Sequence, residues 1–67
     1  MMYNAIEIRD KEHLNPLEVI LVADDMARKG ITHYTMARGN DCIWVYYGQM
    51  NLYYIFRGGK VVDVQID

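Results

Sequence analysis

The sequence contains few of the residues that strengthen or interrupt a small fold. Its 67 residues include one cysteine, Cys42, and one proline, Pro16. A single cysteine excludes an internal disulfide and suits a reducing compartment better than secretion. No apolar run approaches the roughly 18 residues of a membrane span. Charge appears early in the chain, at Glu7, which argues against a signal peptide. We therefore expect a soluble, cytoplasmic protein with a single domain over residues 1–67.

An excess of charge of either sign is also missing. Seven basic and nine acidic residues give a formal net charge of −2, and the two signs are interspersed along the chain. A generic DNA-binding protein is usually basic, and a DNA mimic is strongly acidic. The composition therefore favours neither class.

The sequence lacks the spacings that identify a catalytic or metal site. If residues 31–37 and 42–47 form paired strands, His33 and Cys42 lie roughly 10 Å apart, whereas a nucleophile and its base need about 3 Å. His13 forms no C-x-x-C or H-x-x-x-H spacing with them, so a zinc site is not indicated. Gly58-Gly59-Lys60 lacks the spacing of a phosphate-binding loop. We expect a protein without enzymatic activity, metal or cofactor.

Helix signals are concentrated in one segment, residues 16–29. Asn15 is a favourable N-cap, Pro16 suits the first helical position, and Glu18 occupies the capping-box position. Gly30 is a typical residue just beyond a helix C-terminus. At 100° per residue, one apolar arc is expected to face the core and Val22 the opposite side. The predicted arc comprises Val19, Ile20, Ala23, Met26 and Ala27.

The remaining segments predict strands. Residues 3–9, 31–37, 42–47, 52–57 and 60–66 are rich in β-branched and aromatic residues and are separated by polar or glycine-containing turns. The predicted fold class is α+β, with a single helix packed on one face of a small, mainly antiparallel sheet in the order β-α-β-β-β-β. A two-residue Gly58-Gly59 turn would pair Arg57 with Lys60.

Aromatic residues are concentrated between positions 42 and 56, which hold six of the eight in the chain. Strand residues alternate between faces, so these side chains must occupy both sides of the sheet. The Gly58-Gly59 turn, continued without a bulge, places Tyr53 and Ile55 on the core face. The same register places Leu52, Tyr54, Phe56 and Val61 on the second face.

The length of the turn after residue 47 leaves the preceding strand in one of two registers. In the favoured register, Trp44 and Tyr46 join the second face and Ile43 and Val45 the core. In the alternative, Ile43, Val45 and Tyr47 occupy the second face. A helix about 10 Å wide cannot cover both faces of a sheet roughly 20–24 Å across. An apolar cluster on the second face is therefore expected in either register.

Exposed apolar clusters of this kind typically mark interaction sites. We predict a small binding module that self-associates through this aromatic sheet face, as a homodimer or higher oligomer, and modulates or inhibits a larger partner protein. The alternative is a nucleotide or single-stranded nucleic acid stacked on the same aromatics. The residues predicted to bind are Trp44, Tyr46, Tyr54, Phe56, Val61 and Arg57.

Overall fold

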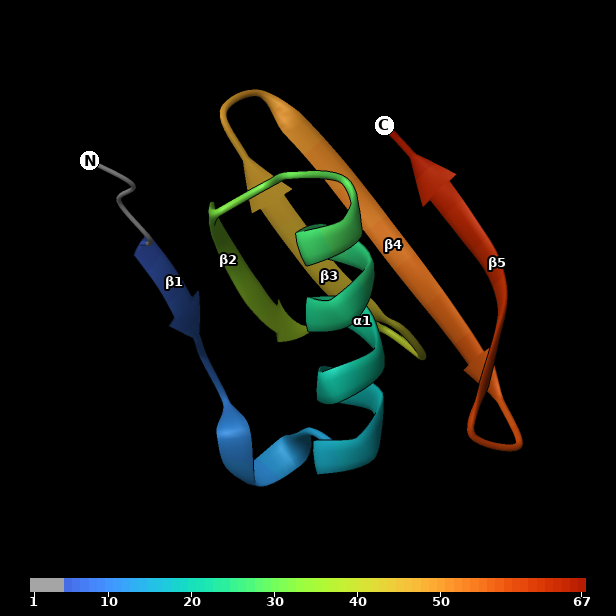
Figure 1. The fold of residues 1–67 in the computed structure, drawn as a ribbon. Coiled ribbons are helices and arrows are strands. Elements are labelled where there is room, and N and C mark those ends of the chain that lie inside the picture. The colour runs from blue at the N-terminus through green and yellow to red at the C-terminus, as the bar shows by residue number, and fades with distance from the viewer. Residues whose placement is uncertain (1–4) are drawn as a thin grey trace.

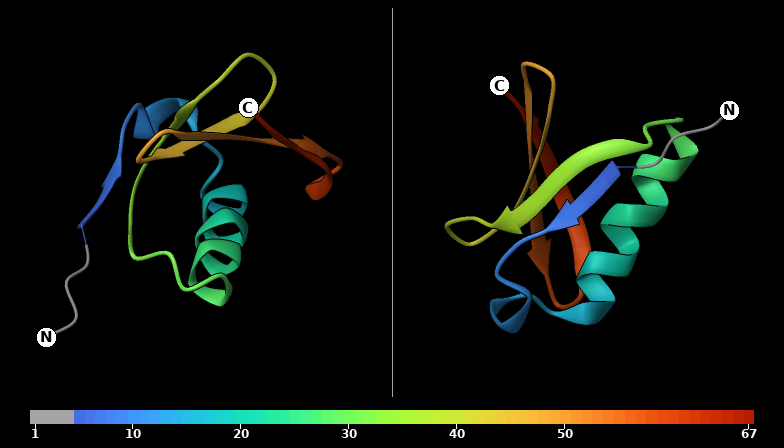
Figure 2. Two further views of the ribbon diagram at one scale, coloured as in Figure 1. Left: turned by 90° about the horizontal axis from the view of Figure 1, so that it is seen from above. Right: turned by 90° about the vertical axis from the view of Figure 1, so that its left-hand side faces the viewer.

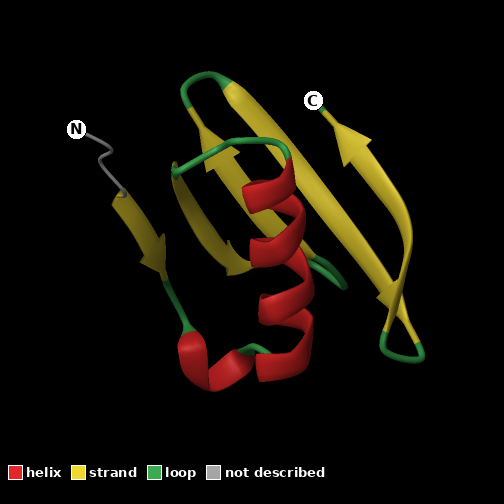
Figure 3. Ribbon diagram, in the orientation of Figure 1, coloured by secondary structure: helices red, strands yellow, loops and turns green. Residues whose placement is uncertain are grey.

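The computed structural model describes residues 5–67, which form one helix packed on a five-stranded sheet (Figure 1, Figure 3). Strand β1 pairs in parallel with β2, and the other neighbours are antiparallel, in the order β1-β2-β3-β4-β5. The α+β fold predicted from the sequence is confirmed, although Tyr3 and Asn4 of the predicted first strand lie outside the described residues. The elements are β1 (Ala5–Ile8), the 3-10 helix η1 (Lys11–His13), α1 (Pro16–Arg28), β2 (His33–Arg38), β3 (Ile43–Tyr47), β4 (Met50–Arg57) and β5 (Lys60–Ile66).

Helix α1 begins and ends at the residues that cap it. The Asn15 side chain accepts a hydrogen bond of 2.9 Å from the backbone N–H of Leu17. At the other end, Gly30 has a φ of 75°, and the N–H of Ile31 donates to the carbonyl of Met26 at 3.0 Å. This is the Schellman arrangement, which glycine adopts without steric cost. The predicted bounds agree with the structure to within one residue.

Two-residue turns close the last two hairpins. Gly58 and Gly59 both have positive φ, and they pair Arg57 with Lys60 as predicted. The preceding turn is shorter than the predicted Gly48–Asn51 segment, because Tyr47 already pairs with Met50. That pairing selects the alternative register, in which Ile43 and Val45 share a face with Leu52 and Tyr54. The favoured register was wrong, although Ile43 and Val45 belong to the core as expected.

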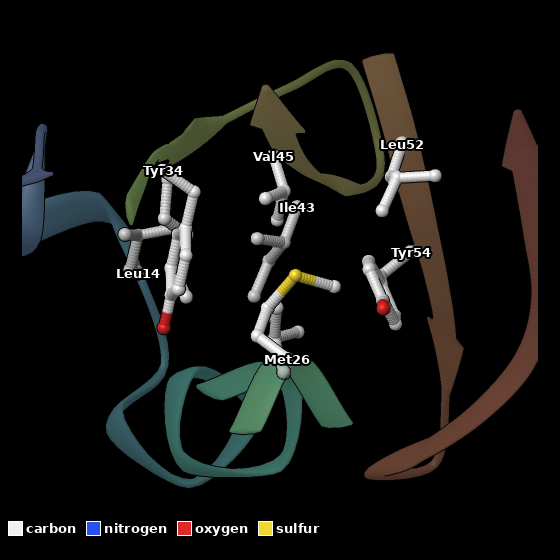
Figure 4. Close-up of a cluster of buried hydrophobic side chains, with 9 residues drawn as sticks. Leu14, Met26, Tyr34, Ile43, Val45, Leu52 and Tyr54 are labelled. Carbon is white, nitrogen blue, oxygen red and sulfur yellow. The ribbon is translucent and has the colours of Figure 1, made fainter. Parts of the chain in front are cut away.

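The core lies between α1 and one face of the sheet. Viewed along the sheet, the helix occupies one side, and no described element covers the other (Figure 2). Met26 projects from α1 toward side chains of β2, β3 and β4 (Figure 4). The buried cluster comprises Leu14, Val22, Met26, Tyr34, Met36, Ile43, Val45, Leu52 and Tyr54.

The stripe with which the helix faces the sheet agrees only in part with the predicted arc, because it contains Val19 and Met26 but includes Val22 and excludes Ile20. Val22 is completely buried, whereas Ile20 is 62% exposed and Leu17 is 72% exposed. Residues 19–22 are all apolar, so their pattern cannot fix the rotation of this part of the helix. Partly buried Val19 and buried Met26 complete a stripe with Val22 at helical spacing.

The two faces of β4 are also exchanged relative to the prediction. A β-bulge separates the pair Phe56–Val61 from the pair Ile55–Asp63. The extra residue in β5 shifts the register by one, so Tyr54 pairs with Val64 instead of Tyr53. Leu52 and Tyr54 are buried beneath α1, where they pair with the core residues Val45 and Ile43.

Candidate functional site

The candidate site is the sheet face that points away from α1, which we call the open face. The pairings Ala37–Trp44 and Trp44–Tyr53 place side chains from β2, β3 and β4 in one row across the sheet. All members of the row except buried Ala37 retain partial exposure. The open face comprises Thr35, Ala37, Trp44, Tyr46, Asn51, Tyr53, Ile55, Asp63 and Gln65.

The aromatic rings of the open face pack against one another. The centroids of Trp44 and Tyr46 are 4.6 Å apart, with an angle of 35° between the ring planes. This separation lies within the range of favourable aromatic pairs. The two rings alternate with core residues along β3, so the backbone of the sheet holds them in place.

The polar atoms of these aromatics already have partners within the chain. Trp44 donates a hydrogen bond of 3.0 Å from Nε1 to Oδ1 of Asn51 on the neighbouring strand. The Arg9 side chain hydrogen-bonds the Tyr46 side chain, and this contact raises the pKa of Arg9. Covering the face would therefore leave the indole N–H satisfied, which lowers the cost of removing water.

A groove of about 530 Å³ runs beside Trp44 on the open face. Tyr53 and Ile55 contribute to its apolar wall, and the turn between β2 and β3 closes one end. Its volume lies within the usual range of small-molecule sites. The lining residues are Gly39, Asn40, Asp41, Cys42, Trp44, Tyr53, Ile55 and Gln65.

The thiol at the base of this groove serves in packing. Cys42 is buried, and burial raises the pKa of its thiol, so the reactive thiolate is disfavoured. A Cβ atom on Gly39 would lie 2.5 Å from Cys42 Sγ. A larger residue at position 39 would therefore force the sulfur or the turn to shift.

Charged residues border the groove without dominating it. Asp41 lines one end, and Asp63 extends from β5 beside Ile55. Arg38, Arg57 and Glu18 line an adjoining hollow of about 400 Å³. This hollow shares Asp41, Cys42 and Ile55 with the groove. The open face thus offers a largely apolar surface with mixed charge at its margin.

The structure separates the six predicted binding residues. Trp44 and Tyr46 lie on the open face as predicted. Tyr54 does not, because it pairs with the core residue Ile43 and lies on the helix side, with 1% of its surface exposed. Phe56 packs against the core cluster, and Val61 lines a hollow with Tyr54 on the helix side. These three placements on the second face were wrong.

Arg57 is exposed at the end of β4, at the margin of the open face. The register prediction instead missed Tyr53 and Ile55, which it had assigned to the core. Their strand is apolar on both faces from Leu52 to Phe56, so alternation could not distinguish them. The structure departs from the prediction at two points, the two-residue turn after Tyr47 and the bulge at Val62.

Comparisons with known proteins identify no relative. The chain matches no family model, no curated protein and no solved structure. Within residues 5–67, the structure has no helix with the length and hydrophobicity required to cross a membrane. The same residues contain no cluster of three or more histidine, cysteine, aspartate or glutamate side chains suited to a metal ion.

Proposed function

We propose that this protein is a binding module without enzymatic activity, whose open face docks on a larger protein and modulates or inhibits it. The observation that carries the proposal is an apolar cluster on the open face, which no described element covers. The cluster comprises Trp44, Tyr46, Tyr53 and Ile55. Aromatic side chains contribute large contact areas at low entropic cost and are enriched at protein interfaces.

The size of the molecule is compatible with this role. Its accessible surface is 4896 Å². A standard interface buries about 800 Å² on each partner, which here is about one sixth of the surface. One face of the sheet with its margins can supply that area. A chain of this size can then act by occluding a site on its partner.

The open face is identical on every copy of the chain. Self-association through it, as the sequence predicts, would hide the surface that a larger partner needs. We therefore propose the larger protein as its occupant. The substitution Tyr53→Asp would disrupt both self-association and partner binding through the open face, because it places a charge in the centre of the apolar surface.

The test compares capture by immobilised wild-type protein with capture by the Tyr53→Asp and Ile20→Asp variants. Ile20 is exposed on the helix, so its replacement introduces the same charge away from the open face. We expect Tyr53→Asp to lose a captured protein that Ile20→Asp retains. Circular dichroism should show that both variants fold. Equal capture by the two variants would contradict the proposal.

A nucleotide or single-stranded nucleic acid is the second candidate, and one observation favours it. The groove beside Trp44 and Tyr53 adjoins the hollow lined by Arg38 and Arg57, so a base and a phosphate could be held together. Binding of this kind weakens steeply as salt concentration rises. Titration of Trp44 fluorescence with nucleotides and oligonucleotides at two salt concentrations distinguishes it from apolar protein contact.

A further inference from the structure

Strand β5 has one edge that pairs with no strand among the described residues. Asn51 and Asp67 exchange two backbone hydrogen bonds, of 3.2 and 2.9 Å. Hydrogen-bonded and non-hydrogen-bonded pairs alternate in an antiparallel ladder. The N–H and C=O groups of Val64 and Ile66 therefore point away from β4, toward the free edge (Figure 1).

This edge carries little of the protection that natural sheets usually place there. Exposed edges are commonly blocked by proline, lysine or a bulge. Here Lys60 and the bulge lie at the start of β5, and the regular part runs from Asp63 to Ile66. Val62 and Ile66 are 55% and 67% exposed along it. An open row of backbone groups flanked by apolar side chains is a template for another strand.

The sequence of β5 is complementary to itself in one antiparallel register. Pairing Val64 with Val64 of a second copy also pairs Asp63 with Gln65, and it brings Ile66 of each copy close to the bulged residue Val62 of the other. The Gln65 amide already lies 3.4 Å from Asp63 Oδ2 within one strand and can equally serve the carboxylate of another. Shifting the register by one step in either direction places Asp63 opposite Asp63 or opposite Asp67. Like charges directly opposite are destabilising, so the register centred on Val64 is preferred.

We propose that two copies of this chain dimerise by pairing their β5 edges antiparallel about a twofold axis at Val64. The two sheets then form one continuous sheet, with both open faces on the same side. Neither open face is covered in this arrangement. The dimer would present two copies of the partner-binding surface side by side, and this would increase avidity for a repeated or dimeric target.

Light scattering coupled to size exclusion tests the dimer across a range of protein concentrations. The wild-type chain should have a mass of twice 7.9 kDa. The double variant Val62→Lys/Ile66→Lys brings two lysines close together at both ends of the paired segment. It should weaken dimerisation by about a hundredfold or more. Both positions are exposed, so circular dichroism should show an unchanged fold.

The matched variant Val62→Lys/Ile66→Glu places opposite charges at the same positions and should restore the dimer. A wild-type mass of 7.9 kDa at every concentration would overturn the proposal. So would a dimer that survives the lysine pair, or one that the Lys/Glu variant fails to restore. Tyr53→Asp should leave the mass unchanged, so the result is independent of the function proposed for the open face.

Discussion

The Tyr54 hydroxyl donates a hydrogen bond of 2.5 Å to Oδ2 of Asp25, which joins strand β4 to helix α1. Lys29 Nζ lies 3.0 Å from the same carboxylate oxygen, and it also donates to the Tyr54 hydroxyl at 3.4 Å. The bond from Tyr54, followed by that from Lys29, lowers the pKa of Asp25. This polar cluster anchors the helix across the core face, and the opposite face remains open.

Replacement of Tyr54 by Phe should reduce the free energy of unfolding by about 1.5–3 kcal/mol, the usual range for a hydrogen bond to a charged group. The matched change Tyr53→Phe removes a hydroxyl from the adjacent residue on the open face. It should change stability by less than about 0.5 kcal/mol. Urea unfolding followed by circular dichroism measures both. Equal losses would contradict the assignment of the two faces of β4.

Stability should fall above pH 10 because of Tyr54. Burial, followed by its bond to Asp25, raises the pKa of Tyr54 above the ordinary value of 10.0. The unfolded chain then loses this proton at a pH where the folded chain retains it, so unfolding becomes more favourable as pH rises. The stability that the raised pKa of Tyr54 contributes is fully present below pH 10, and it is lost as the pH rises above 10.

Unfolding free energies measured between pH 8 and pH 11 should decrease less steeply in Tyr54→Phe than in Tyr53→Phe. Burial also raises the pKa of Tyr34, so some slope should remain in both variants. Identical slopes would show that Tyr54 is not shielded from solvent in the folded chain.

The rotation of α1 can be tested with two large apolar residues on opposite sides of the helix. Met26 is fully buried, and Met26→Ala should cost about 2–5 kcal/mol. Ile20 is exposed, and Ile20→Ala should change stability by less than about 0.5 kcal/mol. Thermal and urea denaturation provide the comparison. A loss at position 20 comparable to that at position 26 would favour the helix arc predicted from the sequence, because that arc contains both residues.

Gly39→Ala should destabilise the chain by about 1–3 kcal/mol, because the new methyl group would overlap Cys42 Sγ. Replacing Cys42 by Ala removes that sulfur. The double variant Gly39→Ala/Cys42→Ala should therefore recover part of the loss, and a double-mutant cycle measures the coupling. If the two losses simply add, contact with the sulfur is not the reason for glycine at this position.

The secondary structure could be predicted from the sequence because its signals are local. Asn15, Pro16 and Gly30 determine where α1 begins and ends, and the Gly58-Gly59 turn determines the last hairpin. The rotation of the helix about its axis could not be predicted in the same way, because Val22 and Ile20 belong to a continuous apolar segment. Their burial is decided by packing on the sheet, which the sequence pattern does not specify.

The candidate site was only partly predictable for a related reason. Trp44 and Tyr46 were placed correctly because Ile43 and Val45 are natural core residues beneath a helix. Tyr53 and Tyr54 are chemically identical neighbours, and which of them is buried depends on the β3–β4 register and on one extra residue in β5. A bulge of this kind depends on the curvature and packing of the whole sheet. Residues on the open face therefore had to be identified from the structure.

Acrylamide quenching of Trp44 tests the central claim most directly, because Trp44 is the single tryptophan and lies on the open face. The measurement compares the free chain with its complex with the captured partner protein, using a partner variant whose own tryptophans are replaced. Quenching should be efficient in the free chain and strongly reduced in the complex. Equal quenching in both states would show that the partner binds elsewhere and would contradict the role proposed for the open face.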